Sequence, residues 1–140
     1  MRILGLDYGA HTVGVAVSDE TGLIAGRLEI IRREREDHLR RTLARIEALI
    51  AEYGVERIVL GYPLNMDDSE GLRAGKTLQF REQLERRTHL PVSLQDERLS
   101  SVEGVEILRA EGVRAQDMKH RIDAVAAEVI LQDYLNAQET

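Results

Sequence analysis

The chain has 140 residues, 43% of them hydrophobic, which suits one domain with a single core. It has no cysteine, so disulfides, iron–sulfur clusters, a thiol nucleophile and a cysteine-based zinc site are excluded. Nineteen Lys and Arg against 25 Asp and Glu give a net charge of −6, which argues mildly against a general nucleic-acid binder but permits local basic patches. No apolar stretch approaches the roughly 20 residues of a membrane span and no signal peptide is visible, so we expect a soluble cytoplasmic protein without a membrane partner.

Three strand-like segments open the chain. They cover residues 2–7, 12–18 and about 23–31. Residues 19–22, Asp-Glu-Thr-Gly, are a turn signal between the second and third segments, and the link between the first two is also short. We therefore predict an antiparallel meander of three strands.

The pattern then changes to helical spacing. Apolar residues between 39 and 53 recur every three or four positions, with Asp37 as the expected N-cap and Gly54 just after the C-terminus. Residues 55–62 follow as a strand whose apolar centre lacks alternation, as burial on both faces requires. A helix and a buried strand are therefore expected in succession.

A second helix–strand pair comes next. Residues 65–75 are polar and glycine-containing, and we expect a mobile loop there. A helix over about 74–87 would carry Leu78 and Leu84 towards the core, and residues 90–95 form a short strand.

Two helices are expected to close the chain. Ser100 or Ser101 caps one that ends near residue 109, and the last runs from about 118 to 136. The resulting order is β-β-β-α-β-α-β-α-α. It predicts an α/β fold in which a mixed five-stranded sheet, flanked by helices, has the first, fourth and fifth strands parallel. This is the ribonuclease-H-like arrangement, and we expect residues 1–140 to form a single domain of this kind.

Carboxylates follow two of the predicted parallel strands. Asp7 ends the first strand, and Asp96 and Glu97 end the fifth. Asp123 lies near the start of the last helix, where its apolar neighbours would pack on the sheet. Carboxyl ends of parallel strands meet at one edge, so Asp7, Glu97 and Asp123 are expected to converge. Phosphodiester hydrolysis with two Mg²⁺ or Mn²⁺ ions requires such a carboxylate cluster.

Each carboxylate also has a simpler interpretation. Asp7 would satisfy the amides of a turn, and Asp96 and Glu97 would be a solvated strand end paired with Arg98. Asp123 would be favoured by the dipole at a helix N-terminus. The shared placement at one end of one sheet favours the metal site.

Motifs distributed along the chain resemble those of the YqgF (RuvX) family, the group of Holliday junction resolvases and pre-16S rRNA nucleases. As a set they span nearly the whole chain in the family's order. The matching stretches are residues 4–9 (Leu-Gly-Leu-Asp-Tyr-Gly), 14–19 (Gly-Val-Ala-Val-Ser-Asp), 61–67 (Gly-Tyr-Pro-Leu-Asn-Met-Asp) with 69–71 (Ser-Glu-Gly), 96–100 (Asp-Glu-Arg-Leu-Ser) and 122–127 (Ile-Asp-Ala-Val-Ala-Ala).

The resemblance implies a Mg²⁺- or Mn²⁺-dependent nuclease of structured or single-stranded nucleic acid. Its acidic site, catalytic and metal-binding, maps onto Asp7, Glu97 and Asp123. Other positions implied to support the site or to contact substrate are Gly9, Asn65, Asp96 and Arg98. Unlike family members with a basic residue just after the first strand, this chain has Ala-His-Thr at positions 10–12, and the simplest interpretation of the histidine is an exposed turn residue.

The densest basic region lies between residues 32 and 45. The simplest interpretation is a solvated helix face with interleaved Glu34, Glu36 and Glu47. The basic residues concerned are Arg32, Arg33, Arg35, Arg40, Arg41 and Arg45.

The sequence is consistent with three functions. The first is an endonuclease acting on RNA, with ribosomal RNA precursors as substrate, or on junction DNA, for which a homodimer would supply two symmetric cuts. The second is a nucleotide-binding protein of the actin-like fold, which requires a second lobe that 140 residues cannot supply. The third is a non-catalytic binding factor, against which the acidic trio argues. The sequence favours the nuclease.

Overall fold

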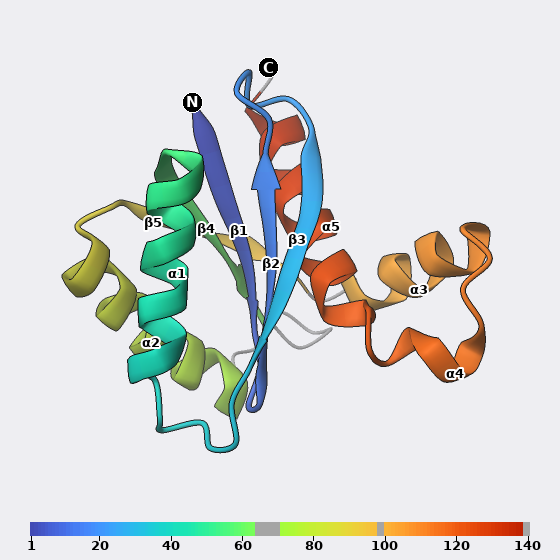
Figure 1. Ribbon diagram of the computed structural model, residues 1–140, viewed down its shortest axis with the longest axis horizontal. Coiled ribbons are helices and arrows are strands. Elements are labelled where there is room, and N and C mark those ends of the chain that lie inside the picture. Colours follow the sequence, from blue (N-terminus) through green and yellow to red (C-terminus); the bar gives the residue numbers. More distant parts are fainter. Residues whose placement is uncertain (64–70, 98–99, 139–140) are drawn as a thin grey trace.

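The computed structural model describes residues 1–63, 71–97 and 100–138, which form a helix-flanked sheet (Figure 1). The strand order is β3-β2-β1-β4-β5, in which β1, β4 and β5 are parallel and β2 is antiparallel to both of its neighbours. The predicted meander and the predicted parallel strands are thus confirmed. The elements in chain order are β1 (Arg2–Tyr8), β2 (Thr12–Ser18), β3 (Ala25–Arg32), α1 (Arg40–Tyr53), β4 (Val55–Tyr62), α2 (Leu72–Thr88), β5 (Val92–Asp96), α3 (Ser100–Ala110), α4 (Ala115–Met118) and α5 (Ile122–Ala137).

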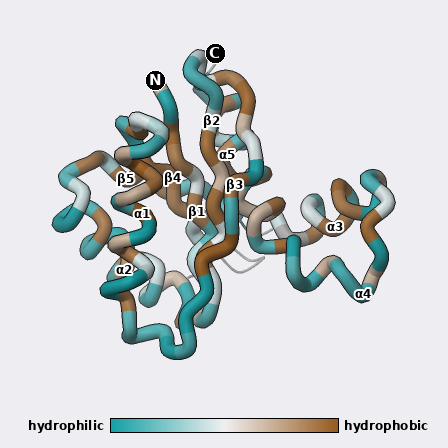
Figure 2. The backbone as a smooth tube through the Cα atoms, in the orientation of Figure 1, coloured by the Kyte–Doolittle hydropathy of each residue, from teal (hydrophilic) through white to brown (hydrophobic). Residues whose placement is uncertain are grey.

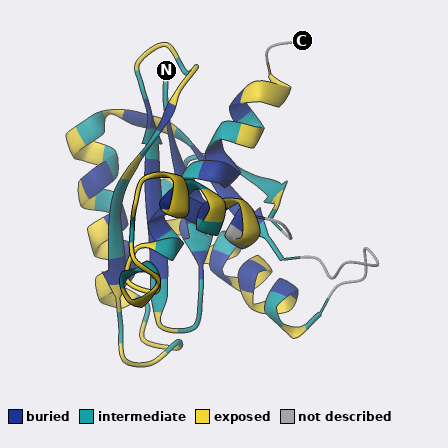
Figure 3. Cartoon of the chain, turned by 90° about the vertical axis from the view of Figure 1, so that its right-hand side faces the viewer, coloured by how far each residue is buried: buried dark blue, intermediate teal, exposed yellow. Residues whose placement is uncertain are grey.

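Helices cover both faces of the sheet. On one face, α1 and α2 enclose a core that includes Leu4, Leu6 and Phe80, and on the other α5 encloses a second core that includes Ile3 and Ile130. Hydrophobic stretches run through the sheet in Figure 2. The central strands β2, β1 and β4 are mostly buried, whereas the edge strands β3 and β5 are only partly buried (Figure 3). α3 packs against α5, so α3 and α4 lie to one side of the sheet (Figure 1).

The start of α1 differs from the prediction. Asp37 is not the N-cap: the helix begins at Arg40, and Leu39 precedes it without a capping side chain. Asp37 lies in the preceding loop, where its carboxylate contacts the Arg35 guanidinium at 3.5 Å and the His38 ring at 4.0 Å. Because these contacts engage the Asp37 carboxylate, it does not cap α1 as the sequence predicted. Gly54 does end α1, with a left-handed φ of 64°.

Two further predictions about helices are wrong. Leu78 was expected in the core with Leu84, but Leu78 is 38% exposed, and Thr77 and Phe80 fill that position of α2 instead. The last helix was expected to begin near Met118, where α4 in fact ends. The chain turns before α5 begins, which brings the first turn of α5 against the sheet. None of the described helices is long and apolar enough to cross a bilayer.

Candidate active site

Asp7 lies near the end of β1, on the face of the sheet that α5 covers. Alternate residues of a strand point to opposite faces. Leu4, Leu6 and Tyr8 belong to the core beneath α1 and α2, whereas Ile3 belongs to the core beneath α5. Asp7 follows Ile3 by four positions, so its carboxylate points towards α5.

Glu97 reaches Asp7 by passing over β4. It directly follows the edge strand β5, and its N–H donates to the carbonyl oxygen of Tyr62 in β4 at 3.3 Å. A Cβ on Gly61 of β4 would lie 2.7 Å from Oε2 of Glu97, far inside van der Waals contact. Because Gly61 leaves that space free, the Glu97 carboxyl crosses the strand and forms a hydrogen bond with Asp7.

Asp123 enters the site from the first turn of α5. Gly14 of β2 lies opposite Asp7 in the sheet, and a Cβ on Gly14 would lie 1.9 Å from the carbonyl oxygen of Asp123. The missing side chain therefore allows the start of α5 to rest on β2 beside Asp7. Thr12 fixes the carboxylate, because its Oγ1 donates to Oδ2 of Asp123 at 2.7 Å.

The electrostatics of the site follow from burial and like charge. Burial raises the pKa of Asp7, the hydrogen bond from Glu97 lowers it, and the negative charge of Asp123 raises it. Burial, followed by the charge of Asp7 and the hydrogen bond to it, raises the pKa of Glu97 to about 9. With a pKa of about 9, Glu97 keeps its proton at neutral pH and can donate it to Asp7.

Arg73 provides positive charge beside this pair. It lies in the first turn of α2, where Nη1 donates to both carboxylate oxygens of Glu36 (2.9 and 2.7 Å) and Nη2 to the carbonyl oxygen of Tyr8 at 3.3 Å. Its charge lowers the pKa values of both Asp7 and Glu97. Arg73 is thus held by Glu36 next to the residue that follows Asp7.

The three predicted acidic residues are therefore at one end of the sheet but are not equivalent. Asp7 and Glu97 are hydrogen-bonded, whereas the Asp123 carboxylate is held by Thr12. Within residues 1–63, 71–97 and 100–138, no three Asp, Glu or His side chains surround a common point as a ready set of metal ligands. The structure brings together a carboxyl pair with a third carboxylate beside it.

The remaining predicted residues differ in their placement. The Gly9 N–H donates to the carbonyl oxygen of Thr12 at 2.8 Å and so closes the β1–β2 turn. Asp96 is the exposed last residue of β5. Asn65 and Arg98 lie outside the described residues, as does the predicted loop from 65 to 70. Residues 72–75, predicted to end that loop, belong instead to α2.

Four residues of the site were not predicted. The roles of Gly14 and Gly61 could have been predicted from the sequence, because a glycine within an apolar strand often marks the close approach of another group. The roles of Thr12 and Arg73 could not have been predicted, because each residue acts through a partner that is distant in the sequence.

The fold and the carboxyl pair define a ribonuclease-H-like protein, and solved structures agree with the fold. RuvC of T. thermophilus, solved in complex with a Holliday junction substrate, matches with a TM-score of 0.63 and 18% identity, over 99% of this chain and 95% of that chain. The fowlpox virus Holliday junction resolvase matches with a TM-score of 0.60 and 13% identity, over 99% of each chain. At these identities the likeness establishes a shared fold.

Sequence comparison identifies the family. Residues 1–137 match the family described as "RuvX: Holliday junction resolvase", and the chain belongs to it. A protein of Agathobacter rectalis is 53% identical over 136 residues, covering 97% of this chain and 95% of that protein. One of Lachnospira eligens is 51% identical over 139 residues, covering 99% of each. Both are named "Putative pre-16S rRNA nuclease". The family predicted from the motifs is confirmed, and the chain is a nuclease.

Proposed function

We propose that this nuclease is an endonuclease that requires Mg²⁺ or Mn²⁺ and cuts RNA, with the precursor of 16S rRNA as its substrate. The names of the two bacterial relatives support the substrate. The observation that carries the metal requirement is the close Asp7–Glu97 pair, in which burial and neighbouring negative charge raise the pKa of both carboxyls.

The donor set fits a hard divalent cation. Mg²⁺ and Mn²⁺ prefer carboxylate oxygens, and a cation between Asp7 and Glu97 would remove the repulsion that the proton now relieves. Asp123 lies beside the pair and would complete the set. When bound, such ions activate water and stabilise the leaving oxygen of a phosphodiester.

The other residues of the site have positioning roles in this proposal. Thr12 orients the Asp123 carboxylate, and Gly61 and Gly14 let Glu97 and α5 approach Asp7. Arg73 adds positive charge on the same side, which would attract the phosphate being cut.

Junction DNA is the second candidate substrate, since the family description names Holliday junction resolvases. Resolution of a junction needs two cuts on symmetric strands, so this activity would require a homodimer with two sites. Purified protein that cuts four-way junctions in symmetric pairs and elutes as a dimer would favour it over RNA.

The experiment is cleavage of end-labelled pre-16S rRNA and of a labelled four-way DNA junction, with Mg²⁺, Mn²⁺ or EDTA. We expect wild type to cut the RNA internally with either metal and not with EDTA. Asp7→Asn keeps the shape of the side chain but removes its charge, and should lower the rate by orders of magnitude. The matched control is Asp117→Asn, an Asp to Asn change on α4 away from the site, which should cut as wild type does. Equal cutting by wild type and Asp7→Asn, or cutting in EDTA, contradicts the proposal.

A further inference from the structure

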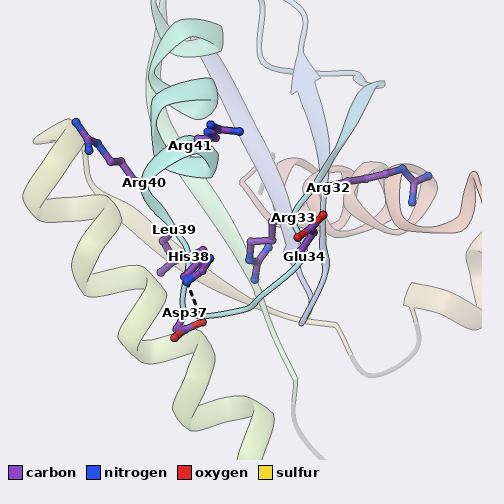
Figure 4. Close-up of a pocket in the computed structure, with 8 residues that line it drawn as sticks. All are labelled: Arg32, Arg33, Glu34, Asp37, His38, Leu39, Arg40 and Arg41. Atoms are coloured by element: carbon purple, nitrogen blue, oxygen red, sulfur yellow. Dashed lines mark ion pairs between the residues drawn. The ribbon is translucent and has the colours of Figure 1, made fainter.

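A basic pocket lies where β3 leads into α1. Arg32, Arg33, Arg40 and Arg41 contribute to its lining, and its volume is about 700 Å³ (Figure 4). The four side chains come from the end of β3, the loop after it and the first turn of α1. Segments on both sides of the loop thus bring positive charge to one cavity of a protein whose net charge is −6.

The arginines of the basic pocket lack acidic partners. Glutamates close to them in sequence are engaged elsewhere: Glu36 binds Arg73 and Glu47 binds Arg87, each at 2.7 Å. Across the part of the chain that the structure describes, none of the four arginines forms an ion pair. Their charge is opposed within the cavity by Glu34 and by Asp37, which already contacts His38 (Figure 4).

Arg33 has unused hydrogen-bond donors. Its Nη2 donates to the carbonyl oxygen of Gly9 at 2.7 Å, and its guanidinium lies 4.8 Å from the centre of the Tyr8 ring. The other two nitrogens, Nε and Nη1, are buried and have no hydrogen-bond partner among the described residues. Buried donors without partners are costly, so the guanidinium would gain by turning this edge to an anion in the pocket.

The start of α1 adds further positive potential. The first N–H groups of a helix lack partners within the helix, and the helix dipole is positive at that end. In this helix of 14 residues no side chain caps the N-terminus and no acidic residue occupies the first turn, which carries Arg40 and Arg41. Cations there are unfavourable unless an anion neutralises them.

The basic pocket is connected to the carboxylates through β1 and β2. Arg32 pairs with Thr12 in the sheet, and Thr12 holds Asp123. Arg33 binds the carbonyl of Gly9, two positions after Asp7. The β1–β2 turn itself has no Lys or Arg, and His11 in it is exposed. Arg33 therefore places a positive charge at the β1–β2 turn, which has no Lys or Arg of its own.

We propose that the basic pocket binds a backbone phosphate of the nucleic-acid strand, next to the phosphodiester that is cut. This proposal rests on the proposed function, because the strand is the substrate that the acidic site is proposed to cut. A strand, rather than a free anion, is favoured because the cavity, of about 700 Å³, is lined by four arginines that form no ion pair among the described residues. One of them, Arg33, also binds the turn that follows Asp7. The pocket would thereby hold the strand in register while the carboxylates act on it.

The test measures binding separately from cutting. Affinity for a fluorescein-labelled single-stranded RNA is followed by anisotropy at several salt concentrations, in an Asp7→Asn background that does not cut. Arg33→Ala and, as a second variant on the exposed start of α1, Arg41→Ala are compared with Arg86→Ala. Arg86 is an equally basic but exposed residue near the C-terminal end of α2, paired with Glu82. Circular dichroism checks that each variant folds.

We expect Arg33→Ala and Arg41→Ala each to weaken binding about tenfold, as loss of a charge-assisted contact does. The slope of log affinity against log salt should fall by about 0.7 for each lost phosphate contact. Arg86→Ala should change neither quantity. Arg33→Lys, which keeps the charge but not the fork of donors, should recover part of the loss.

Two results would overturn the proposal. One is unchanged affinity and unchanged salt slope in both pocket variants. The other is binding of inorganic phosphate by calorimetry as tightly as RNA, which would assign the pocket to a free anion. Because binding is measured without cutting, failure of wild type to cleave RNA would count against the proposed function and leave the pocket result readable.

Discussion

The carboxyl pair and the basic pocket hold like charges close together at the same end of β1, but they tolerate it by different means. Glu97 keeps its proton in its hydrogen bond with Asp7 and both lie near Arg73, so the repulsion is relieved inside the protein. Across the described residues, the arginines of the pocket form no ion pair, because Glu36 and Glu47 bind α2 instead. A proton can be displaced by a cation, whereas an unpaired guanidinium needs an anion. The two clusters are therefore complementary to a metal ion and to a phosphate.

The supporting structures also differ. The acidic residues are positioned by strands and by close backbone contacts at Gly14 and Gly61. The basic residues lie on a loop and on the first turn of a helix. Rigid elements hold chemical groups to narrow tolerances, while loops adapt to a polymer that must enter and leave. This difference predicts that damage to the first cluster lowers the rate and damage to the second lowers affinity.

The largest effect should come from Glu97→Gln. Glutamine reproduces the protonated carboxyl, so folding and RNA affinity should be retained, but it cannot become an anionic ligand. Loss of a residue that only supports a ligand costs 10- to 100-fold, so we expect kcat to fall by at least about 100-fold. Single-turnover cleavage and anisotropy on the same RNA measure the two quantities. A variant that cuts normally but binds weakly would reverse the assignment of the two clusters.

Gly61→Ala should damage the acidic site without removing any polar group. Its new Cβ would lie 2.7 Å from both Oε2 of Glu97 and Cδ1 of Ile130. We expect a cost of about 1–3 kcal/mol in stability from overpacking and a marked loss of cleavage as Glu97 is displaced. Gly75→Ala is the matched control: its Cβ meets nothing within 4 Å near the start of α2, so it should stabilise by up to about 1 kcal/mol. Urea unfolding compares the two, and a fully active Gly61→Ala would refute the positioning role.

Much of the fold was predictable because its signals are local. Strand periodicity and short turns determined the meander, and the alternation of elements determined the parallel strands. The start of α1 was not predictable, since Asp37 is a good N-cap in sequence but is engaged by Arg35 and His38 in the loop. The prediction that Leu78 is buried was wrong because the spacing of apolar residues alone does not show which face of α2 packs on the sheet.

The candidate site was predictable as a set of residues and not as an arrangement. The carboxylates follow strands, so their gathering at one edge follows from topology. That Glu97 crosses β4 to Asp7, while Asp123 is held by Thr12, depends on contacts between residues distant in sequence. The basic pocket was obscured for the same reason, because Glu36 and Glu47 are local in sequence but pair with α2.

Thr12→Val should produce a smaller loss. Valine keeps the shape but removes the hydroxyl that donates to Asp123 at 2.7 Å. As a partner of a ligand rather than a ligand, Thr12 should be worth roughly tenfold in kcat. Thr12→Ser retains the donor and should restore most of the rate in the same assay. Equal losses in both variants would point to packing instead of orientation.

The smallest predicted effect is on folding stability, which should decrease as pH rises. The pKa of Glu97 is raised from 4.5 to about 9 in the folded protein, so between these values the folded state holds a proton that the unfolded state has released. Without divalent ions, the contribution of Glu97 to stability is therefore full below about pH 4.5 and is lost as pH rises towards about 9. Melting temperatures should fall more steeply with pH in wild type than in Glu97→Gln. Parallel profiles would show that the two carboxyls do not share a proton.

Proton release on binding of Mn²⁺ tests the central claim most directly. If the ion replaces the proton between Asp7 and Glu97, calorimetry at neutral pH in buffers of different ionisation enthalpy should detect release of about one proton for each ion that binds the pair. Glu97→Gln should bind more weakly and release none. Binding to wild type without proton release, or identical binding and release in Glu97→Gln, would contradict the account.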